Sequence, residues 1–278
     1  MLSLSRSRLR FLISSLLSFV CVLLVAACST DAPTSEAVSP AADPAAVPVL
    51  RVAVNPAFPP FEFKAADGSL QGFDIDLINA IGGTAGFLID FDELSFDDLI
   101  RNLYGGQVDV AISAITINRD RSERVAFSRP YFKSGLAIAI READTDITAF
   151  DSLNGKRVGV ERGTTSELKA QTLVNADVKR FASAPQALQD LAAGRLDAVI
   201  NDAPVTLYAI QSGSVSGLKL LDPLLSEEFY GIAVPKDSPY LEPINAALTT
   251  LIDNGTYAQI YQRWFAAEPP PLPDTAPL

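Results

Sequence analysis

The sequence predicts an α/β fold made of two lobes, on the basis of three observations. Short β-branched runs alternate with segments of helical periodicity along most of the chain. A helix–glycine–strand pattern occurs twice, at residues 99–113 and 187–201. Of the 278 residues, 48% are hydrophobic and 20% are charged, a balance typical of a chain that folds around a core.

The expected strands are runs of β-branched and aliphatic residues: Leu50–Val54, Val108–Ile112, Leu136–Ile140, Arg157–Val160, Leu196–Ile200 and Gly231–Val234. The expected helices have apolar residues every three or four positions: Ile75–Ile81, Phe96–Leu103, Thr165–Val174, Pro185–Ala193, Pro204–Gln211 and Tyr240–Ile252. Gly82-Gly83 interrupts the first of these helices, and Asp74 and Asp76 are expected to cap and flank its start. Asn254-Gly255 supplies a C-cap before Thr256 begins another turn.

The repeated pattern reads LIRNLYGGQVDVAIS in its first copy and ALQDLAAGRLDAVIN in its second. Each copy is a helix, a glycine stop and an aspartate that opens a buried strand. Composition alone can produce such a recurrence, but two similar α/β lobes explain it more fully. Because ligands of open α/β sheets lie beyond the carboxyl ends of strands, residues 113–116 and Asn201-Asp202 are expected to face each other across one cleft.

The first 27 residues predict an export signal. Three arginines precede the apolar run Phe11–Ala27, which at 17 residues is shorter than the usual length for spanning a bilayer. Val25-Ala26-Ala27-Cys28 resembles a lipobox, so Cys28 is expected to be acylated and to become the new N-terminus. No second apolar run of spanning length follows.

The segments on either side of the fold are rich in proline. Residues 28–48 predict a flexible tether, and residues 268–278 predict a disordered tail. Removal of Cys21 with the signal would leave Cys28 as the single cysteine, so no intramolecular disulfide is expected.

Composition excludes several functions. The 22 basic and 33 acidic residues give a net charge of −11, which argues against nucleic-acid binding. The chain has no histidine, so histidine-based nucleophile systems and histidine-ligated metals are excluded. No phosphate-binding or nucleophile-elbow motif is present, and we expect neither a cofactor nor a metal.

Seven stretches occur in an order that resembles the bacterial extracellular solute-binding proteins of family 3, the polar amino-acid class. They are LRVAVNPAFPPFEF (50–63), GFDIDL (72–77), VDVAISAITINRDRSERVAFSRPYFKSG (108–135), VGVERGTTSE (158–167), LDAVINDAP (196–204), YGIAVPKDSP (230–239) and NGTYAQIYQRWF (254–265). The resemblance implies a type II periplasmic-binding-protein fold, with lobe 1 at residues 49–133 and 231–267 and lobe 2 at residues 134–230. It places the hinges near Tyr131–Gly135 and Ser226–Gly231, where two strands cross between the lobes.

A free amino acid needs a cation for its carboxylate and an anion for its ammonium group. Arg121, the arginine of a Thr-x-x-x-x-Arg pattern that begins at Thr116, is the expected carboxylate clamp. Asp202 is expected either to cap the following helix or to bind the ammonium group, and the resemblance favours the second role. Thr164 and Thr165 open a helix with Glu167 as a capping box, which is compatible with carboxylate binding.

The remaining site residues follow from the resemblance. Ser113, Thr116 and the carbonyl group of Ala114 would complete the cradle for the two charges, and Phe58 and Phe96 would sandwich the ligand or pack in the core. Three positions depart from the glutamine-binding pattern, which has an acid, a lysine and a histidine there: Asn55, Glu161 and Asn201. Glu161, expected near the rim, would repel an acidic ligand, so a neutral polar or cationic amino acid is favoured.

The expected function is amino-acid capture by lobe closure for the permease of an ABC importer, by a monomer anchored at the outer face of the cytoplasmic membrane or in the periplasm. One alternative is a dehydratase-like lyase of the same fold, with Glu161 as the acid. The other is an amino-acid sensing subunit, which sequence does not distinguish from a transport protein.

Overall fold

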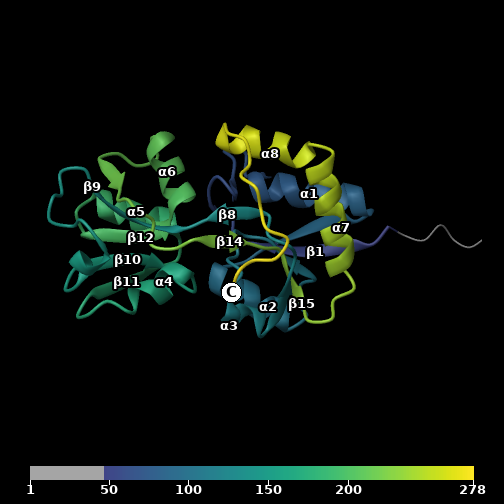
Figure 1. The fold of residues 1–278 in the computed structure, drawn as a ribbon, viewed down its shortest axis with the longest axis horizontal. Coiled ribbons are helices and arrows are strands. Elements are labelled where there is room, and N and C mark those ends of the chain that lie inside the picture. Colours follow the sequence, from purple (N-terminus) through teal and green to yellow (C-terminus); the bar gives the residue numbers. More distant parts are fainter. Residues whose placement is uncertain (1–46) are drawn as a thin grey trace, which may run out of the picture. The chain divides into compact units, whose positions relative to one another are not determined.

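Two five-stranded sheets form the framework of residues 47–278, the part of the chain that the computed structural model describes (Figure 1). The first sheet contains, in spatial order, β5 (Leu88–Glu93), β1 (Val49–Val54), β6 (Val110–Ala111), β15 (Ala233–Pro235) and β7 (Val125–Phe127). The second contains β11 (Asp177–Phe181), β10 (Arg157–Glu161), β12 (Ala198–Asp202), β9 (Leu136–Arg141) and β13 (Leu218–Leu220). In each sheet three neighbouring strands are parallel, and the next strand, β15 or β9, is antiparallel to them.

Each sheet has its own helices and forms an α/β lobe with them. Lobe 1 has α1 (Phe73–Ala85), α2 (Phe96–Tyr104), α3 (Arg119–Ser122), α7 (Leu241–Asp253), α8 (Thr256–Phe265) and a small sheet of β2 (Ala57–Phe58), β3 (Glu62–Lys64) and β4 (Leu70–Gln71). Lobe 2 has a 3₁₀ helix (Phe150–Leu153), α4 (Thr165–Ala170), α5 (Ala184–Ala192) and α6 (Ala203–Gln211). The predicted fold of two α/β lobes is confirmed.

Two strands connect the lobes. β8 (Phe132–Ser134) and β14 (Glu228–Tyr230) pair antiparallel, with Ser134 opposite Glu228, and both lie between the two sheets in Figure 1. β9 of lobe 2 begins two residues after β8, and β15 of lobe 1 begins three residues after β14. A narrow two-stranded connection between two separate cores is the kind of element that allows hinge motion.

The internal repeat extends to the side chains that hold each lobe together. In lobe 1 the Arg51 guanidinium donates to both carboxylate oxygens of Asp109 and to the carbonyl group of Gly106. In lobe 2 Arg157 makes the same three bonds to Asp197 and the carbonyl group of Gly194. Composition does not produce a matching hydrogen-bond set, so the two lobes are versions of one α/β unit.

The twelve expected strands and helices all coincide with observed elements, with shifted ends. Nine strands were not predicted, and four of them, β5, β7, β11 and β13, are the outer strands of the two five-stranded sheets. The others are the short strands β2, β3, β4, β8 and β14. β5 and β11 are made of alternating exposed and half-buried residues, LIDFDE and DVKRF, so they lack the apolar run on which the predictions relied. Edge strands meet a core on one face only, which weakens their sequence signal.

The first helix was predicted too short. α1 continues through Gly82 and Gly83 and ends at Ala85, where Gly86 takes a left-handed conformation. A Cβ atom at Gly82 would lie 2.9 Å from the side chain of Ile89 in β5, so the glycine allows the helix to pack closely on the sheet. The expected role of Asp74 as a cap is also wrong, because its side chain is fully buried and bonds to other segments.

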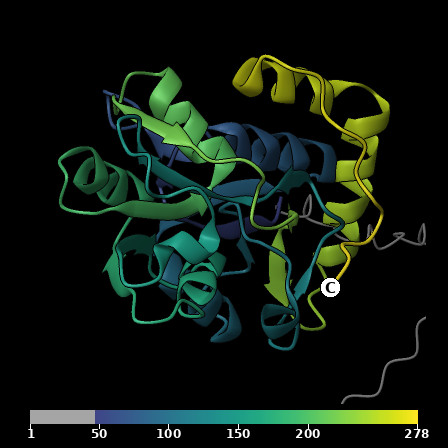
Figure 2. The same cartoon turned by 60° about the vertical axis from the view of Figure 1, so that its left-hand side comes forward.

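The predicted disorder of the C-terminal tail is wrong. Residues 268–278 contain no helix or strand, but they run back along lobe 1 from α8 to the C-terminus, as the yellow trace shows in Figures 1 and 2. Asp274 accepts a hydrogen bond of 2.9 Å from Arg129, Leu272 packs against the lobe 1 core, and Ala276 is buried. Proline-rich composition did not prevent docking here, because scattered apolar side chains were sufficient for contact.

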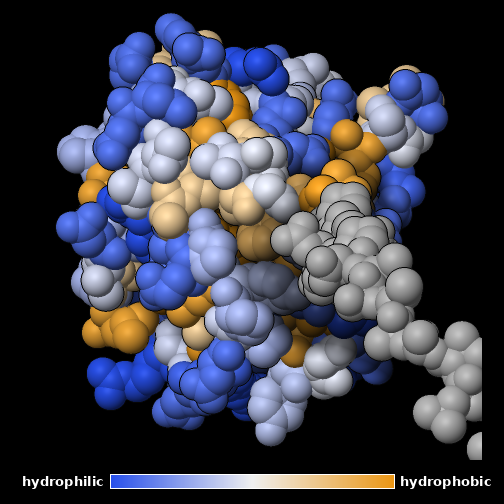
Figure 3. Space-filling view, turned by 90° about the vertical axis from the view of Figure 1, so that its right-hand side faces the viewer, coloured by the Kyte–Doolittle hydropathy of each residue, from blue (hydrophilic) through white to orange (hydrophobic). Residues whose placement is uncertain are grey.

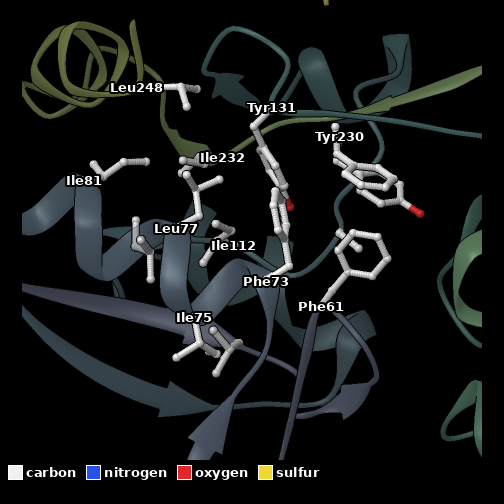
Figure 4. Close-up of a cluster of buried hydrophobic side chains, with 14 of the residues drawn as sticks. Phe61, Phe73, Ile75, Leu77, Ile81, Ile112, Tyr131, Tyr230, Ile232 and Leu248 are labelled. Carbon is white, nitrogen blue, oxygen red and sulfur yellow. The ribbon is translucent and has the colours of Figure 1, made fainter. Parts of the chain in front are cut away.

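Aromatic residues form much of the lobe 1 core (Figure 4). The ring of Phe61 lies 5.3 Å from that of Tyr230, and Phe73 stacks on Tyr131 at 6.2 Å. Tyr131 directly precedes β8 and Tyr230 is the last residue of β14, so this core fixes the base of the hinge. On the outer face of lobe 1 drawn in Figure 3, hydrophilic residues predominate and hydrophobic residues form small separate areas.

Candidate functional site

A small cavity of about 240 Å³ lies between the lobes, and little of it is wider than a water molecule. Lobe 1 contributes five lining residues and lobe 2 contributes four: Phe58, Phe96, Ala114, Thr116 and Arg121, and Glu161, Thr164, Thr165 and Asp202. All nine are among the twelve residues expected at the site. Asn55, Ser113 and Asn201 do not line the cavity.

The lobes are in contact around this cavity. The Arg121 Nη2 atom of lobe 1 donates to the carbonyl group of Gly163 in lobe 2 at 3.2 Å. A Cβ atom at Gly163 would lie 2.9 Å from that of Asp97 in lobe 1, and Gly163 has a φ of +79°, so only glycine fits this approach. The structure therefore has the closed arrangement of the two lobes.

Arg121 carries the positive charge of the cavity. It lies in α3, which begins where the Asn118 side chain accepts from the Arg121 backbone N–H group. Its Nη1 atom donates to the carbonyl group of Thr116 at 2.9 Å, and its guanidinium lies 5.3 Å from the centre of the Phe96 ring. Loss of solvent lowers the pKa of Arg121 to about 10, so the group stays charged at neutral pH and has donors left for an anion.

Asp202 supplies a carboxyl group from the opposite lobe. It occupies the N-cap position of α6 but makes no capping hydrogen bond, so the capping alternative is not observed. Its Oδ1 atom accepts from Ser134 at 3.4 Å, and the Ser134 hydroxyl accepts from Tyr230. Burial first, and the charge of Glu228 second, raise the pKa of Asp202 to about 7, so the group is partly protonated at neutral pH in the empty cavity and a nearby cation would favour its ionised form.

Glu161 is buried rather than placed at the rim, where the sequence analysis expected it. Its Oε2 atom accepts from the backbone N–H group of Ala184 at 3.0 Å. Burial raises the pKa of Glu161 to about 8, and Asp202 adds to the effect. The side chain is therefore largely uncharged at neutral pH in the empty cavity, which weakens the expected repulsion of acidic ligands.

Thr164 and Thr165 have different tasks. Thr164 caps α4 by accepting from the Glu167 backbone N–H group, and its hydroxyl donates to the carbonyl group of Glu161 at 2.7 Å. The capping box is incomplete, because the Glu167 carboxylate binds the N–H group of Gly163 instead of Thr164. Thr165 donates across the cavity edge to Glu228 at 3.0 Å.

The three expected residues that do not line the cavity lie behind it. Ser113 accepts from the backbone N–H group of Asn55 at 3.1 Å and donates to Glu62. Asn201 points into α6 and donates to Thr206 at 3.1 Å. The side-chain oxygen of Asn55 is buried and has no hydrogen-bond partner among residues 47–278.

Glu228 is a site residue that the sequence analysis missed. It lies in β14, and its Oε2 atom accepts from Thr116 of lobe 1 at 2.7 Å and from Thr165 of lobe 2 at 3.0 Å. It therefore joins both lobes to the crossover strand. An acid within the apolar stretch before Gly231 was the available signal, but its partners are distant in sequence.

The folded chain matches the family described as bacterial extracellular solute-binding proteins, family 3, over residues 50–267. The chain belongs to this family. It is 33% identical over 238 residues to a probable histidine-binding protein of Neisseria gonorrhoeae, covering 84% of this chain and 88% of the relative. It is 35% identical over 222 residues to ABC transporter arginine-binding protein 1 of Escherichia coli, covering 78% and 90%. These relatives are binding proteins and not enzymes.

A solved structure agrees with these matches. An ancestral arginine-binding protein bound to arginine superimposes with a TM-score of 0.75 and 41% identity, covering 78% of this chain and 98% of that one. The family and the fold expected from the seven stretches are thus confirmed.

A larger hollow, of about 1410 Å³ against about 240 Å³ for the cavity, lies elsewhere, between α6 and α8. Its lining is mostly apolar and includes Leu207, Trp264 and Phe265, with Lys133 as its single charged residue. It lacks the paired opposite charges that a free amino acid requires. Within residues 47–278 no cluster of acidic or cysteine side chains could hold a metal ion, and no helix has the length and apolarity to cross a membrane.

Proposed function

We propose that this family member captures a free polar L-amino acid, cationic in preference to neutral, in the cavity between its lobes. The observation that carries the proposal is the pairing of opposite charges in one closed cavity, Arg121 from lobe 1 and Asp202 from lobe 2. A zwitterion needs both, and a ligand that bridges them would bind the closed form more tightly than the open form. The arginine- and histidine-binding relatives support this ligand class.

The carboxylate of the ligand would bind to Arg121, whose planar guanidinium can contact both oxygens, with Thr164 and Thr165 on the other side. The ammonium group would bind to Asp202 and to the carbonyl group of Ala114. Thr116 lies at the edge of this cradle, where its hydroxyl is already engaged by Glu228.

The side chain of the ligand would extend between Phe58 and Phe96 towards Glu161. When both are ionised, Glu161 and Asp202 outnumber Arg121 among the charged groups of the cavity, and Glu228 lies close behind. A zwitterion leaves that excess uncompensated, whereas a ligand with one extra positive charge lowers the pKa of both acids and balances the charge that they gain. Charge balance therefore favours arginine, lysine, ornithine or histidine over a neutral ligand.

Release would require opening at the β8–β14 ribbon, because the ligand would be enclosed by both lobes. In the expected cycle the closed complex docks on the permease of an ABC importer, which supplies ATP hydrolysis on other subunits. The export signal and Cys28 lie outside the described residues. From their sequence we propose a lipid anchor at Cys28, and Cys28→Ser is expected to abolish processing and membrane retention.

The direct test is a thermal-shift screen with the twenty amino acids, followed by calorimetry with L-arginine, L-histidine and L-glutamine. A bound ligand raises the melting temperature by mass action, and the cationic ligands should raise it most. X-ray scattering should show that the ligand shifts the protein towards a more compact form. No thermal shift with any amino acid would contradict the proposal, and a shift with acidic amino acids alone would contradict its ligand class.

The lyase alternative is supported by one feature, the raised pKa of the buried Glu161, because a general acid must hold a proton at neutral pH. Incubation with prephenate or arogenate distinguishes the two functions. An aromatic product that disappears in Glu161→Gln would favour the enzyme, and stoichiometric binding without product favours the binding protein.

A further inference from the structure

A second group of buried polar side chains lies behind the cavity and takes no part in lining it. Glu62 of β3, Asp74 of α1, Ser113 after β6 and Tyr131 before β8 are all at most 1% exposed. The group brings together four segments of lobe 1. Two buried carboxyl groups at one place require a physical explanation, because a buried carboxylate is stable only with compensating partners.

Three donors satisfy one oxygen of each carboxyl group. Asp74 Oδ2 accepts from the backbone N–H group of Ala114 at 2.8 Å and from the hydroxyl group of Tyr131 at 2.7 Å. Glu62 Oε1 accepts from the Ser113 hydroxyl at 2.8 Å. Asp74 therefore receives two hydrogen bonds and Glu62 receives one, which favours Asp74 as the ionised partner.

The other two oxygens, Glu62 Oε2 and Asp74 Oδ1, are buried and receive no hydrogen bond from residues 47–278. The two carboxyl groups converge on adjacent residues, since Ser113 bonds to Glu62 and Ala114 bonds to Asp74, and each acts on the pKa of the other. Two carboxylates cannot hydrogen-bond to each other, since neither has a proton. One proton on Glu62 Oε2, donated to Asp74 Oδ1, satisfies both unpartnered oxygens and removes one of two like charges.

No positive charge compensates the pair. The ionisable groups that act on it from the surrounding elements are Tyr131, Tyr257 of α8 and, more weakly, Glu161 of β10, and none of them is cationic. Burial, and then the charge of Asp74, raise the pKa of Glu62 well above its usual range. The electrostatic surroundings therefore agree with the hydrogen-bond geometry.

We propose that Glu62 and Asp74 share one proton in the folded protein and that this pair holds Ser113 and Ala114 in the conformation needed for amino-acid binding. Ala114 has a φ of +47°, which a residue with a Cβ atom adopts only when its surroundings fix it. Its N–H group binds Asp74, and the preceding Ser113 binds Glu62. Glu62 and Asp74 are thus positioning residues, and this half of the inference rests on the proposed function.

The shared proton is tested by infrared spectroscopy, which needs no ligand. The spectrum is recorded well above pH 8, where Asp202 and Glu161 are ionised. The wild type should show the C=O band of a protonated carboxylic acid, and Glu62→Gln should lack it. Asp74→Asn should shift the frequency of the band, because a carboxylic acid that no longer donates to a carboxylate has a different C=O stretch. A band that persists in Glu62→Gln overturns the assignment to Glu62, and a band of unchanged frequency in Asp74→Asn overturns the sharing.

The positioning role is tested by calorimetry with L-arginine on two variants of one residue. Gln has the hydrogen-bonding pattern of a protonated Glu, so Glu62→Gln should bind within about threefold of the wild type, whereas Glu62→Ala should bind about tenfold or more weakly. Glu62→Gln should also lose less thermal stability at alkaline pH. Equal losses of binding in the Gln and Ala variants would contradict the positioning role. If the wild type binds no amino acid, the proposed function fails, but the infrared result still decides whether Glu62 and Asp74 share a proton.

Discussion

Buried charges with few partners distinguish the residues of the cavity from the other charged residues of the fold. Arg51–Asp109 and Arg157–Asp197 are ion pairs whose side chains are 23–45% exposed. Asp202 and Glu161 are buried, and neither makes a salt bridge within residues 47–278. An unpaired buried acid is unfavourable to folding, so its presence at a cavity points to a cation that arrives with the ligand.

Arg121→Ala should weaken the binding of L-arginine by about 2–5 kcal/mol, because the ligand carboxylate would be buried without a partner. Isothermal calorimetry measures the loss. Arg124→Ala is the matched control, since Arg124 is an exposed arginine three residues away. Unchanged affinity in Arg121→Ala, or an equal loss in Arg124→Ala, would remove Arg121 from the site.

Ligand binding should release protons. Asp202 and Glu161, with pKa values raised to about 7 and 8, hold protons in the empty cavity, and a nearby ligand cation lowers both pKa values. The affinity for L-arginine should therefore rise between pH 6 and 8, within the range these pKa values define. Calorimetry in buffers of different ionisation enthalpy counts the protons. The Glu161→Gln variant should release fewer protons when it binds L-arginine. A proton count unchanged by that substitution would contradict the role of Glu161.

At the level of elements, the hinge strands and the C-terminal segment hold parts together that are distant in sequence. β14 carries Glu228, which bonds to a threonine of each lobe. The C-terminal segment carries Asp274, which reaches Arg129 just before the crossover. Neither contact has a sequence motif of its own, so only the folded arrangement reveals it.

Glu228→Ala should shift the protein towards the open arrangement, because Thr116 and Thr165 lose their common acceptor. We expect affinity for L-arginine to fall by about 1–3 kcal/mol and the ligand-free form to become less compact in X-ray scattering. Glu227→Ala is the control, since Glu227 is a neighbouring exposed acid paired with Lys133. Compactness and affinity that match those of the control would show that Glu228 does not link the lobes.

Removal of residues 269–278 should lower the free energy of unfolding by about 1–3 kcal/mol, because it uncovers apolar side chains around Leu272 and deprives Arg129 of a partner. Urea denaturation measures the loss. Asp274→Asn alone should change stability by about 0–1 kcal/mol, since Asp274 is 93% exposed and its ion pair is screened by solvent. A truncated protein as stable as the full chain would show that the docked tail contributes nothing.

For the whole molecule, the excess of buried acids makes stability depend on pH. The folded-state pKa values of Asp202 and Glu161 lie above their ordinary values, so the folded protein binds more protons than the unfolded chain. The stabilisation that these two groups give the folded state is fully present below about pH 4 and is lost as the pH rises to about 8. This differs from a protein whose acids are paired with bases.

The ligand-free protein should therefore melt at a higher temperature at pH 5 than at pH 8, a range bounded above by the pKa of Glu161. The difference in stability should be on the order of a few kcal/mol. The Asp202→Asn, Glu161→Gln double variant should have a flatter profile in differential scanning calorimetry. A wild-type melting temperature that rises from pH 5 to pH 8 would contradict the assigned pKa shifts.

Much of the fold was predictable because its core strands and helices have strong local patterns. β1, β9 and β12 are aliphatic runs, and α2 and α5 carry matching repeats. β5 and β11 were missed because edge strands lack such runs. Nine of the twelve expected site residues line one cavity. Ala114, Thr116 and Asp202 were expected there from their places after strands, and the others mainly from the resemblance to the family; their roles in binding stay predictions.

The sequence by itself determined the class of the protein, since alternating patterns, a repeat and seven ordered stretches are properties of local chain segments. Only the tertiary structure decided how Glu62 meets Asp74, how Glu228 joins two threonines, and that Glu161 is buried. The physical reason is that hydrogen bonding and loss of solvent depend on distances between segments far apart in the chain. Periodicity records which side of an element faces the core, but not which residue of another element it meets there.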